Sequence, residues 1–218
     1  MSTTVGPTLI FQFVDLGGVL ANGVLGGVLA RRLGFDPVGF VVLALISGLG
    51  GGVLRDTLLQ AAPVALHNPA YLAVGLVGAL IAFLVDVRGK VTRRGLVIAD
   101  ALALGAWAAT GTTKALVLDL PWLSAVLVGI ITAVGGGMIR DLVVREVPKV
   151  FLPGTLYATV ALLASLVAGT LTLTGHPNLG MGAAIGLAGV LALAARRFGW
   201  ALPSPVDLRP RIPHRRRS

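Results

Sequence analysis

Two short segments place charged residues and glycines inside apolar runs: GGGVLRD at residues 50–56 and GGGMIRD at residues 135–141. Three glycines in a helix interior cost roughly 1 kcal/mol each relative to alanine. An arginine at the centre of a membrane helix costs at least about 2.5 kcal/mol. The recurrence of such costly residues predicts a functional site. Backbone carbonyls freed at a helix break, together with acidic side chains, could line a route for a desolvating cation.

The glycine triplets are predicted to break or bend two helices and to line a pore, and the charges that follow are candidate pore or gate residues. Consecutive residues point about 100° apart on a helix, so neighbouring Arg and Asp residues are poor partners. We therefore predict exchange between the segments, Arg55 with Asp141 and Arg140 with Asp56. Two other interpretations stay open: the glycines only allow close packing, or the arginines extend to the lipid headgroups. The candidates are Gly50, Gly51, Gly52, Gly135, Gly136, Gly137, Arg55, Asp56, Arg140 and Asp141.

Three further charged residues lie in apolar segments. Asp15 and Asp100 either line a cation route or hold an arginine or backbone partner. Lys114 is isolated from the other basic residues, and it either senses voltage or extends to the lipid surface. His67 and His176 have no neighbours at metal-ligand spacing, so no metal site is expected.

The composition is that of an integral membrane protein. Of the 218 residues, 56% are hydrophobic and 12% are charged, and the mean hydropathy is +0.90, which a soluble domain would not reach. A spanning helix needs roughly 20 apolar residues, and the alternating segments of outer-membrane barrels are absent. We predict an all-α fold with seven transmembrane helices, at about residues 9–30, 38–59, 70–86, 95–117, 122–143, 153–173 and 179–196.

The chain contains an internal duplication. A shift of 85 residues aligns the glycine triplets, the Arg-Asp pairs and the aspartates of the first and fourth predicted helices. We predict one membrane domain at residues 1–197, with a repeat at about 9–86, a second at about 95–173 and an added helix at about 179–196. Three crossings separate the motifs, so the second repeat is inverted. Inverted repeats recur in transport proteins, whose sites lie near the midplane where interrupted helices meet.

Basic residues predict the orientation, because short cytoplasmic loops and tails are enriched in them. With seven crossings, fifteen of the eighteen Lys and Arg residues fall on one side of the membrane and only Lys114 on the other. We predict a multi-pass protein of a bacterial inner membrane, with the N-terminus outside and the C-terminus in the cytoplasm. The basic tail at 198–218 is expected to be disordered and to contact anionic lipids. The net charge of +9 then requires no nucleic acid partner.

Enzyme chemistry has no support in the sequence. It contains no phosphate-binding loop, nucleophile triad or HExxH motif. The chain is therefore not expected to be an enzyme or to need a cofactor.

The doubled Gly-Gly-Gly-x-x-Arg-Asp unit, followed each time by a proline, and the 3+3+1 helix arrangement resemble the prokaryotic trimeric intracellular cation (TRIC) channels over about residues 9–197. Many such bacterial sequences are also described as glycine-transporter-like. The resemblance implies a homotrimer in which each subunit has an hourglass pore for K⁺ and Na⁺, formed mainly by the first, second, fourth and fifth spanning helices. Animal members hold a phosphoinositide with a Lys-Glu-Val sequence, which REVPK at 145–149 matches only in part.

These observations lead to a functional hypothesis and two alternatives. The hypothesis is passive permeation of monovalent cations, with the arginines tied to carboxylates or forming part of a gate. The first alternative is a secondary transporter of a small zwitterion such as glycine, bound at the same helix termini. The second is a scaffold whose intramembrane charges only fix the packing of a trimer.

Overall fold

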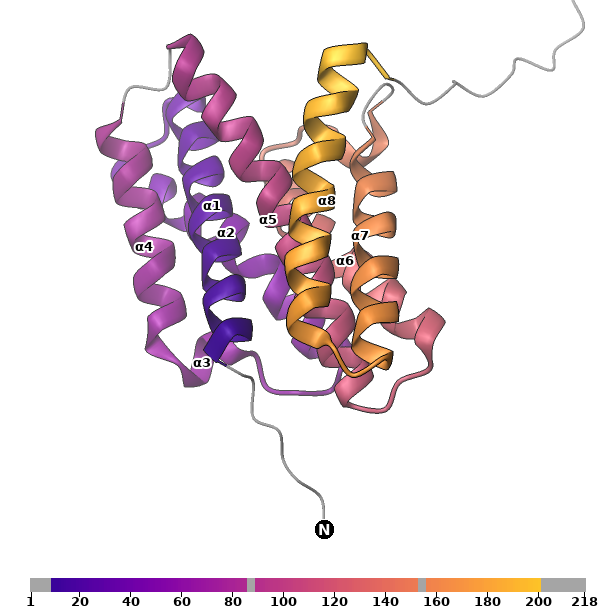
Figure 1. Cartoon of the computed structure of the whole chain (residues 1–218). Helices are drawn as coiled ribbons and strands as arrows, with labels where there is room; N and C mark the ends of the chain where they lie inside the picture. The colour runs from indigo at the N-terminus through magenta and orange to yellow at the C-terminus, as the bar shows by residue number, and fades with distance from the viewer. Residues whose placement is uncertain (1–8, 86–88, 153–155, 201–218) are drawn as a thin grey trace, which may run out of the picture.

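The computed structural model describes residues 9–85, 89–152 and 156–200, and the regular elements in these ranges are all helical (Figure 1). This confirms the all-α prediction. Most of the predicted tail, residues 201–218, lies outside the described residues. The elements are α1 (Leu9–Leu33), α2 (Pro37–Leu58), α3 (Val64–His67), α4 (Pro69–Leu84), α5 (Lys90–Val117), α6 (Trp122–Val143), the 3₁₀ helix η1 (Lys149–Phe151), α7 (Tyr157–Leu173) and α8 (Pro177–Phe198).

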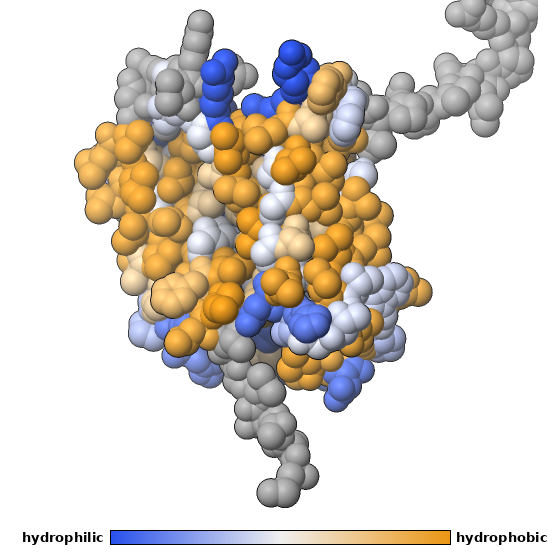
Figure 2. All heavy atoms as spheres, viewed as in Figure 1, coloured by the Kyte–Doolittle hydropathy of each residue, from blue (hydrophilic) through white to orange (hydrophobic). Residues whose placement is uncertain are grey.

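Five helices in the described ranges are long and apolar enough to cross a membrane: α1, α2, α5, α6 and α8. Helices α4 and α7 are apolar but shorter, with 16 and 17 residues. The predicted span 122–143 coincides with α6, whereas α1 and α5 extend past their predicted spans into polar sequence. Figure 2 shows apolar side chains over the sides of the bundle and hydrophilic residues towards its two ends, as a lipid environment requires.

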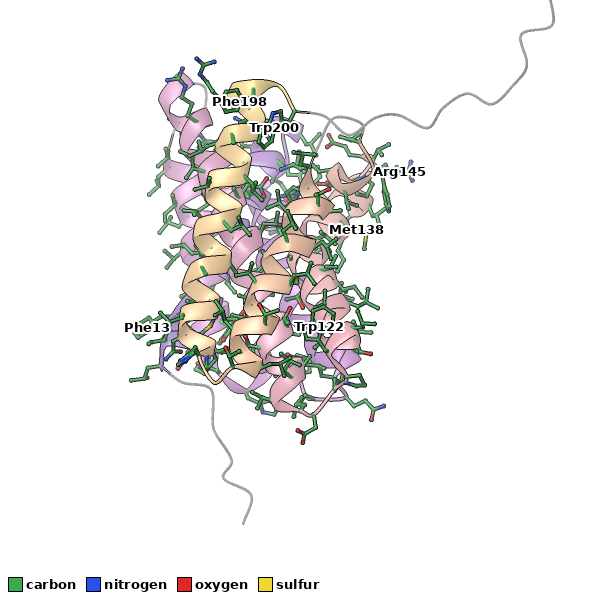
Figure 3. The ribbon with its side chains drawn as sticks, turned by 45° about the vertical axis from the view of Figure 1, so that its right-hand side comes forward. Phe13, Trp122, Met138, Arg145, Phe198 and Trp200 are labelled. Atoms are coloured by element: carbon green, nitrogen blue, oxygen red, sulfur yellow. The ribbon has the colours of Figure 1, made fainter. Side chains whose placement is uncertain are left out.

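Helices α2 and α6 correspond closely, because both their first and their last residues lie 85 positions apart. Each is followed by a turn through a residue with positive φ, Gln60 at 54° and Arg145 at 60°. The two helices run in opposite directions. Helix α2 ends beside α3 at the bottom of Figure 1, whereas α6 starts at Trp122 near the bottom of Figure 3 and ends near Arg145 towards the top.

The glycine triplets lie inside α2 and α6, and both helices continue through them without interruption. The expected break is therefore absent. A Cβ atom on Gly51 would lie 2.4 Å from the carbonyl oxygen of Thr132 in α6, and one on Gly136 would lie 2.5 Å from that of Ser47 in α2. The triplets thus bring two backbones into contact, which is the close-packing interpretation of these glycines.

Gly51→Ala should destabilise the protein even though alanine is the better helix former. Its methyl group would collide with the backbone carbonyl of Thr132, so we expect a loss of about 1–3 kcal/mol. Gly52→Ala is a matched control, since a Cβ there would meet only Arg55 Nη2 at 3.8 Å, and it should be neutral or stabilise by up to about 1 kcal/mol. Thermal unfolding in lipid nanodiscs compares the two. Equal melting temperatures would contradict the close approach of α2 and α6.

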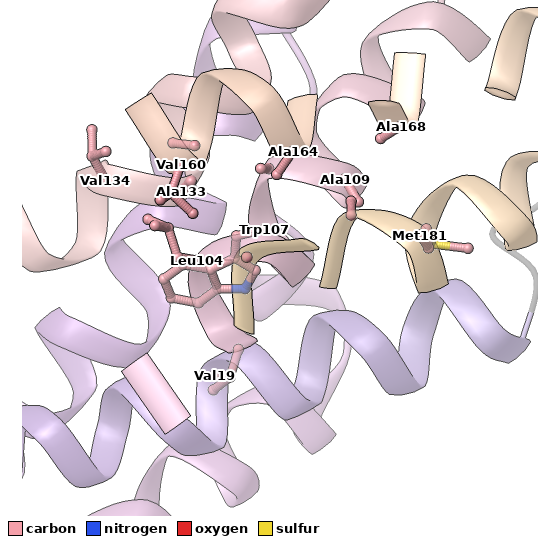
Figure 4. Close-up of a cluster of buried hydrophobic side chains, with 14 of the residues drawn as sticks. Val19, Leu104, Trp107, Ala109, Ala133, Val134, Val160, Ala164, Ala168 and Met181 are labelled. Atoms are coloured by element: carbon pink, nitrogen blue, oxygen red, sulfur yellow. The ribbon is translucent and has the colours of Figure 1, made fainter. Parts of the chain in front are cut away.

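The centre of the bundle is an apolar cluster around Trp107 of α5 (Figure 4). The Trp107 side chain is buried, and it lies against glycines of three helices. Cβ atoms on Gly18, Gly51 and Gly136 would come within 2.4, 3.1 and 3.1 Å of its ring atoms. These glycines of α1, α2 and α6 therefore make room for one large ring where the helices cross. Other members of the cluster are Val19, Leu104, Val160, Ala164 and Met181.

Candidate functional site

Four charged side chains form a buried group near the end of α2, which we call the α3-end cluster: Asp15 of α1, Arg55 and Asp56 of α2, and Lys114 of α5. Arg55 bridges the two carboxylates, with Nη1 3.0 Å from Asp15 Oδ1 and Nε donating to Asp56 Oδ1 at 2.8 Å. Lys114 Nζ donates to the same Asp56 oxygen at 2.7 Å. The side chains of Arg55, Asp15 and Asp56 are at most 2% exposed. The cluster contains two positive and two negative charges, so it is neutral.

Uncharged groups donate further hydrogen bonds to the two carboxylates. The Tyr71 hydroxyl of α4 donates to Asp15 Oδ2 at 2.9 Å, and the Thr110 hydroxyl of α5 donates to Asp15 Oδ1 at 3.3 Å. The backbone N–H of Val64 donates to Asp56 Oδ2 at 2.8 Å, because the chain turns after α2 and brings the start of α3 back to it. Buried charges persist only when they are paired and hydrogen-bonded in this way.

A second group, the η1-end cluster, lies near the end of α6 and contains Asp100, Arg140, Asp141 and Lys149. Arg140 donates from Nε and Nη2 to Asp141 Oδ1, at 2.8 and 2.7 Å. The backbone N–H of Lys149 donates to Asp141 Oδ2 at 3.3 Å, and its Nζ donates to Asp100 Oδ2 at 2.7 Å. The Tyr157 hydroxyl donates to Asp100 Oδ1 at 3.1 Å. This cluster is also neutral.

The two clusters share a plan but differ in the cations that hold their carboxylates. In each, the motif aspartate accepts from the preceding arginine and from a backbone N–H eight residues later, while a tyrosine donates to the other aspartate. Arg55 also reaches Asp15, whereas the cation bound to Asp100 is Lys149. The Asp100–Lys149 pair is the more open one, since these side chains are 15% and 41% exposed.

Several predictions about the charges are wrong. Arg55 and Arg140 pair with the aspartate next to them in sequence and not across the two motifs. The lipid-headgroup interpretation also fails for them, because they are 1% and 4% exposed. Lys114 binds Asp56 and does not extend to the lipid surface. Asp15 holds an arginine partner, Arg55, as one of its two interpretations predicts, whereas Asp100 is paired with a lysine, Lys149.

Two large cavities lie at opposite ends of the bundle. The α3-end cavity has a volume of about 590 Å³, and the η1-end cavity has a volume of about 600 Å³. The first is lined by Phe11, Gln12, Arg55, Val64, Asn68, Tyr71, Thr113, Lys114, Val117, Leu118, Thr172, Gly175, Pro177, Asn178 and Met181. The second is lined by Val97, Asp100, Ala101, Leu104, Lys149, Leu156, Tyr157, Val160, Ala192, Ala195, Arg196, Gly199 and Trp200.

The Trp107 cluster separates these cavities. Met181 lines the first cavity, Leu104 and Val160 line the second, and all three belong to the cluster. Along α5, Thr113 lies nine positions after Leu104, which corresponds to about 13 Å. The side chains between the two cavities are therefore apolar and buried.

Sequence reasoning missed Tyr71, Tyr157, Lys149 and Trp107. The two tyrosines are the only ones in the chain, but they lie 86 residues apart and therefore escape an alignment at an offset of 85. Trp107 aligns with Asn22 at that offset, so the duplication does not mark it. Its role follows from the glycines around it, which only the packing of the helices reveals.

The chemistry available in the two clusters is ion pairing, in which a carboxylate can exchange one cationic partner for another. Among the described residues, no three His, Cys, Asp or Glu side chains are grouped so that they could hold a metal ion. The carboxylates are held by cations of the chain itself, and a passing ion could displace or join these cations.

Comparisons with known proteins agree over most of the chain. A family model described as "Glycine transporter" matches residues 12–86 and 97–172. The UPF0126 inner membrane protein YadS of Escherichia coli is 31% identical over 199 residues, which are 90% of this chain and 96% of that protein. A UPF0126 membrane protein of Deinococcus radiodurans is 40% identical over 152 residues, which are 69% of this chain and 71% of that protein. The TRIC trimeric intracellular cation channel orthologue from Rhodobacter sphaeroides has a similar structure, with a TM-score of 0.80 and 31% identity over 88% of this chain and 99% of that one.

Proposed function

Because this chain belongs to the family of trimeric intracellular cation (TRIC) channels, we propose that it is a channel for the monovalent cations K⁺ and Na⁺. It acts as a homotrimer with one pore in each subunit. The relative from Rhodobacter sphaeroides is described as a trimeric cation channel. These relatives are named as a cation channel and as membrane proteins, and none of the three is named as an enzyme. The proposed activity requires no cofactor, only the permeant ion.

The pair of cavities is the observation that carries the proposal. Two cavities of nearly equal volume lie at opposite ends of the bundle, with an apolar barrier between them. A passive pore closed at its middle has this form, and widening of the barrier would join the cavities. The aspartates of the two clusters supply negative charge near each cavity, and they favour cations once their internal partners shift.

The proposed topology has seven crossings, with two inverted three-helix repeats and α8 as the added helix, all in one domain at 1–197. The opposite directions of α2 and α6 and the matching bonds of the two clusters support the inversion. We place the α3 end outside and the η1 end in the cytoplasm, since fifteen of the Lys and Arg residues fall on the η1 side and, apart from those of the two motifs, only Lys114 falls on the α3 side. The Escherichia coli relative is named an inner membrane protein. The basic tail at 198–218 is proposed to contact anionic lipids.

Lys114 is proposed to act as a voltage sensor. It is 26% exposed at the wall of the α3-end cavity and holds Asp56, which is fully buried. One elementary charge moved through 100 mV gains about 2.3 kcal/mol, enough to weaken one such ion pair. The glycine triplets are proposed to bend α2 and α6 during opening, since the helices are continuous through them in this structure.

Transport of a small zwitterion such as glycine is the second candidate. The description of the family model points to it. The η1-end cavity presents one carboxylate, Asp100, together with the cations Lys149 and Arg196. These groups could bind the ammonium and the carboxylate of a zwitterion at the same time.

Current recordings from the purified chain in planar bilayers test the proposal. We expect unitary K⁺ and Na⁺ currents and no counterflow of labelled glycine; counterflow without unitary currents would identify a carrier instead. The double variant Asp56→Asn with Asp141→Asn should alter conductance or cation selectivity, because it removes one carboxylate from each cluster. Asp119→Asn, on an exposed turn, is the control. Identical currents in both variants would contradict the role of Asp56 and Asp141.

A further inference from the structure

The α3-end cavity has a charge distribution that cation permeation does not explain. Among the described residues that line it, only Arg55 and Lys114 are charged, and both are cationic. The carboxylates of Asp15 and Asp56 lie behind them, in side chains that are at most 2% exposed. A molecule that enters this cavity therefore meets the ammonium of Lys114 before it meets any carboxylate.

Lys114 keeps donor capacity for a ligand. An ammonium carries three N–H donors, and in the described part of the chain Lys114 makes one hydrogen bond, to Asp56 Oδ1. Gln12 and Asn68 line the same cavity and add amide N–H donors. Such donors around an accessible ammonium suit an anionic headgroup, since hydrogen bonds between ionised groups are the strong ones.

The rest of the wall is largely apolar. Phe11, Val117, Leu118 and Met181 contribute to it. The volume of about 590 Å³ lies within the range of about 300–1,000 Å³ found for small-molecule sites, which combine an apolar wall with a few polar groups that orient the ligand. The cavity thus complements a molecule that has one negative charge and an apolar body.

We propose that the α3-end cavity binds an amphipathic organic monoanion, such as an alkyl carboxylate or sulfonate of medium chain length. Its charged group lies against Lys114, and its chain lies along the apolar wall. A zwitterion fits this cavity poorly, because the described residues that line it offer no accessible carboxylate to receive an ammonium. The site goes beyond the proposed channel activity, and it can be tested without any ion flux.

The chain contains no cysteine, so Asn178→Cys places a single thiol at the cavity. In nanodiscs containing the full chain, octane-1-sulfonate should slow the reaction of this thiol with neutral methyl methanethiosulfonate. Octyltrimethylammonium at the same concentration should not slow it. Across hexane-, octane- and decane-1-sulfonate, each pair of added methylenes should tighten binding roughly tenfold.

Added to the Asn178→Cys chain, Lys114→Gln should weaken sulfonate protection by about tenfold or more, whereas Lys114→Arg should retain it. Lys149→Gln, the matched lysine of the η1-end cavity, should leave it unchanged. Three results would overturn the proposal. The first is that the sulfonate gives no protection, and the second is that the ammonium compound protects equally well. The third is that protection is lost in Lys149→Gln but not in Lys114→Gln. Protection that depends on the nanodisc lipid and not on added sulfonate would also overturn it, since an acyl chain would then occupy the cavity. If Lys114→Gln fails to fold, the comparison of sulfonate with ammonium and the Lys114→Arg variant still test whether the cavity binds the anion.

Discussion

Replacing Arg55 with methionine should lower the free energy of unfolding by about 3–5 kcal/mol, the range for removing one partner of a buried ion pair. Arg55 is the cation that joins Asp15 and Asp56, in a site where the three side chains are at most 2% exposed. Tyr71 and Thr110 would still donate to Asp15, but neither can neutralise its charge. Thermal or denaturant unfolding in lipid nanodiscs measures the loss.

Arg140→Met is the matched variant in the other half, and it should also cost about 3–5 kcal/mol, because Asp141 loses the arginine that pairs with it. Asp100 would keep Lys149, but the backbone N–H that still donates to Asp141 cannot neutralise its charge. The double variant Asp15→Asn with Arg55→Met should be less destabilising than the sum of its single changes, because it removes the orphaned charge. Strict additivity in this double variant would show that Arg55 does not bridge the two carboxylates.

Leu104→Ser should raise the K⁺ flux through the resting protein by roughly tenfold or more. Leu104 lines the η1-end cavity and belongs to the apolar barrier. The substitution removes about 2 kcal/mol of apolar transfer free energy from the constriction, which makes water and ions less costly there, and about 1.4 kcal/mol corresponds to a tenfold change in rate. Flux of K⁺ from proteoliposomes reports the change.

Leu102→Ser, two residues earlier on α5, is the control, since Leu102 is 39% exposed and lies outside the Trp107 cluster. It should leave the resting flux unchanged. Met181→Ser, on the α8 side of the barrier, should reproduce the effect of Leu104→Ser if the two side chains close the same path. A similar flux in the Leu102 and Leu104 variants would place the constriction elsewhere.

The sequence predicted the helices well because membrane spans are set by the length of their apolar runs. The span 122–143 agrees with α6 at both ends. The predicted helix ends are wrong where a helix continues into polar sequence, because hydropathy identifies only the apolar part of a helix. Helix α5 begins at Lys90, five residues before its predicted start, although its first turns are basic.

Most of the charged residues that the structure brings together could be named from the sequence, but most of their partners could not. The directions of the Cβ atoms alone disfavour a pair between Arg55 and Asp56. An arginine head lies several flexible bonds away from its backbone, so it can turn back to the next residue when both groups avoid lipid. The helix break predicted at the glycine triplets is absent for a different reason. Glycines are used both where a helix breaks and where two helices cross closely, so the triplets alone do not distinguish the two. Only the neighbours of Gly51 and Gly136 distinguish these two cases.

The contact between α2 and α6 also determines which parts of the bundle can move. Where two backbones meet with no side chains between them, the helices can rotate about the contact but cannot be pushed closer together. The crossing at the triplets is therefore a pivot. Both cavities are bordered by α5, α7 and α8, and α8 meets α5 at Gly105, where a Cβ atom would lie 2.8 Å from the carbonyl oxygen of Ala184. Helix α8 is therefore packed closely on α5 between the two cavities, and any opening that joins them has to change this second contact as well.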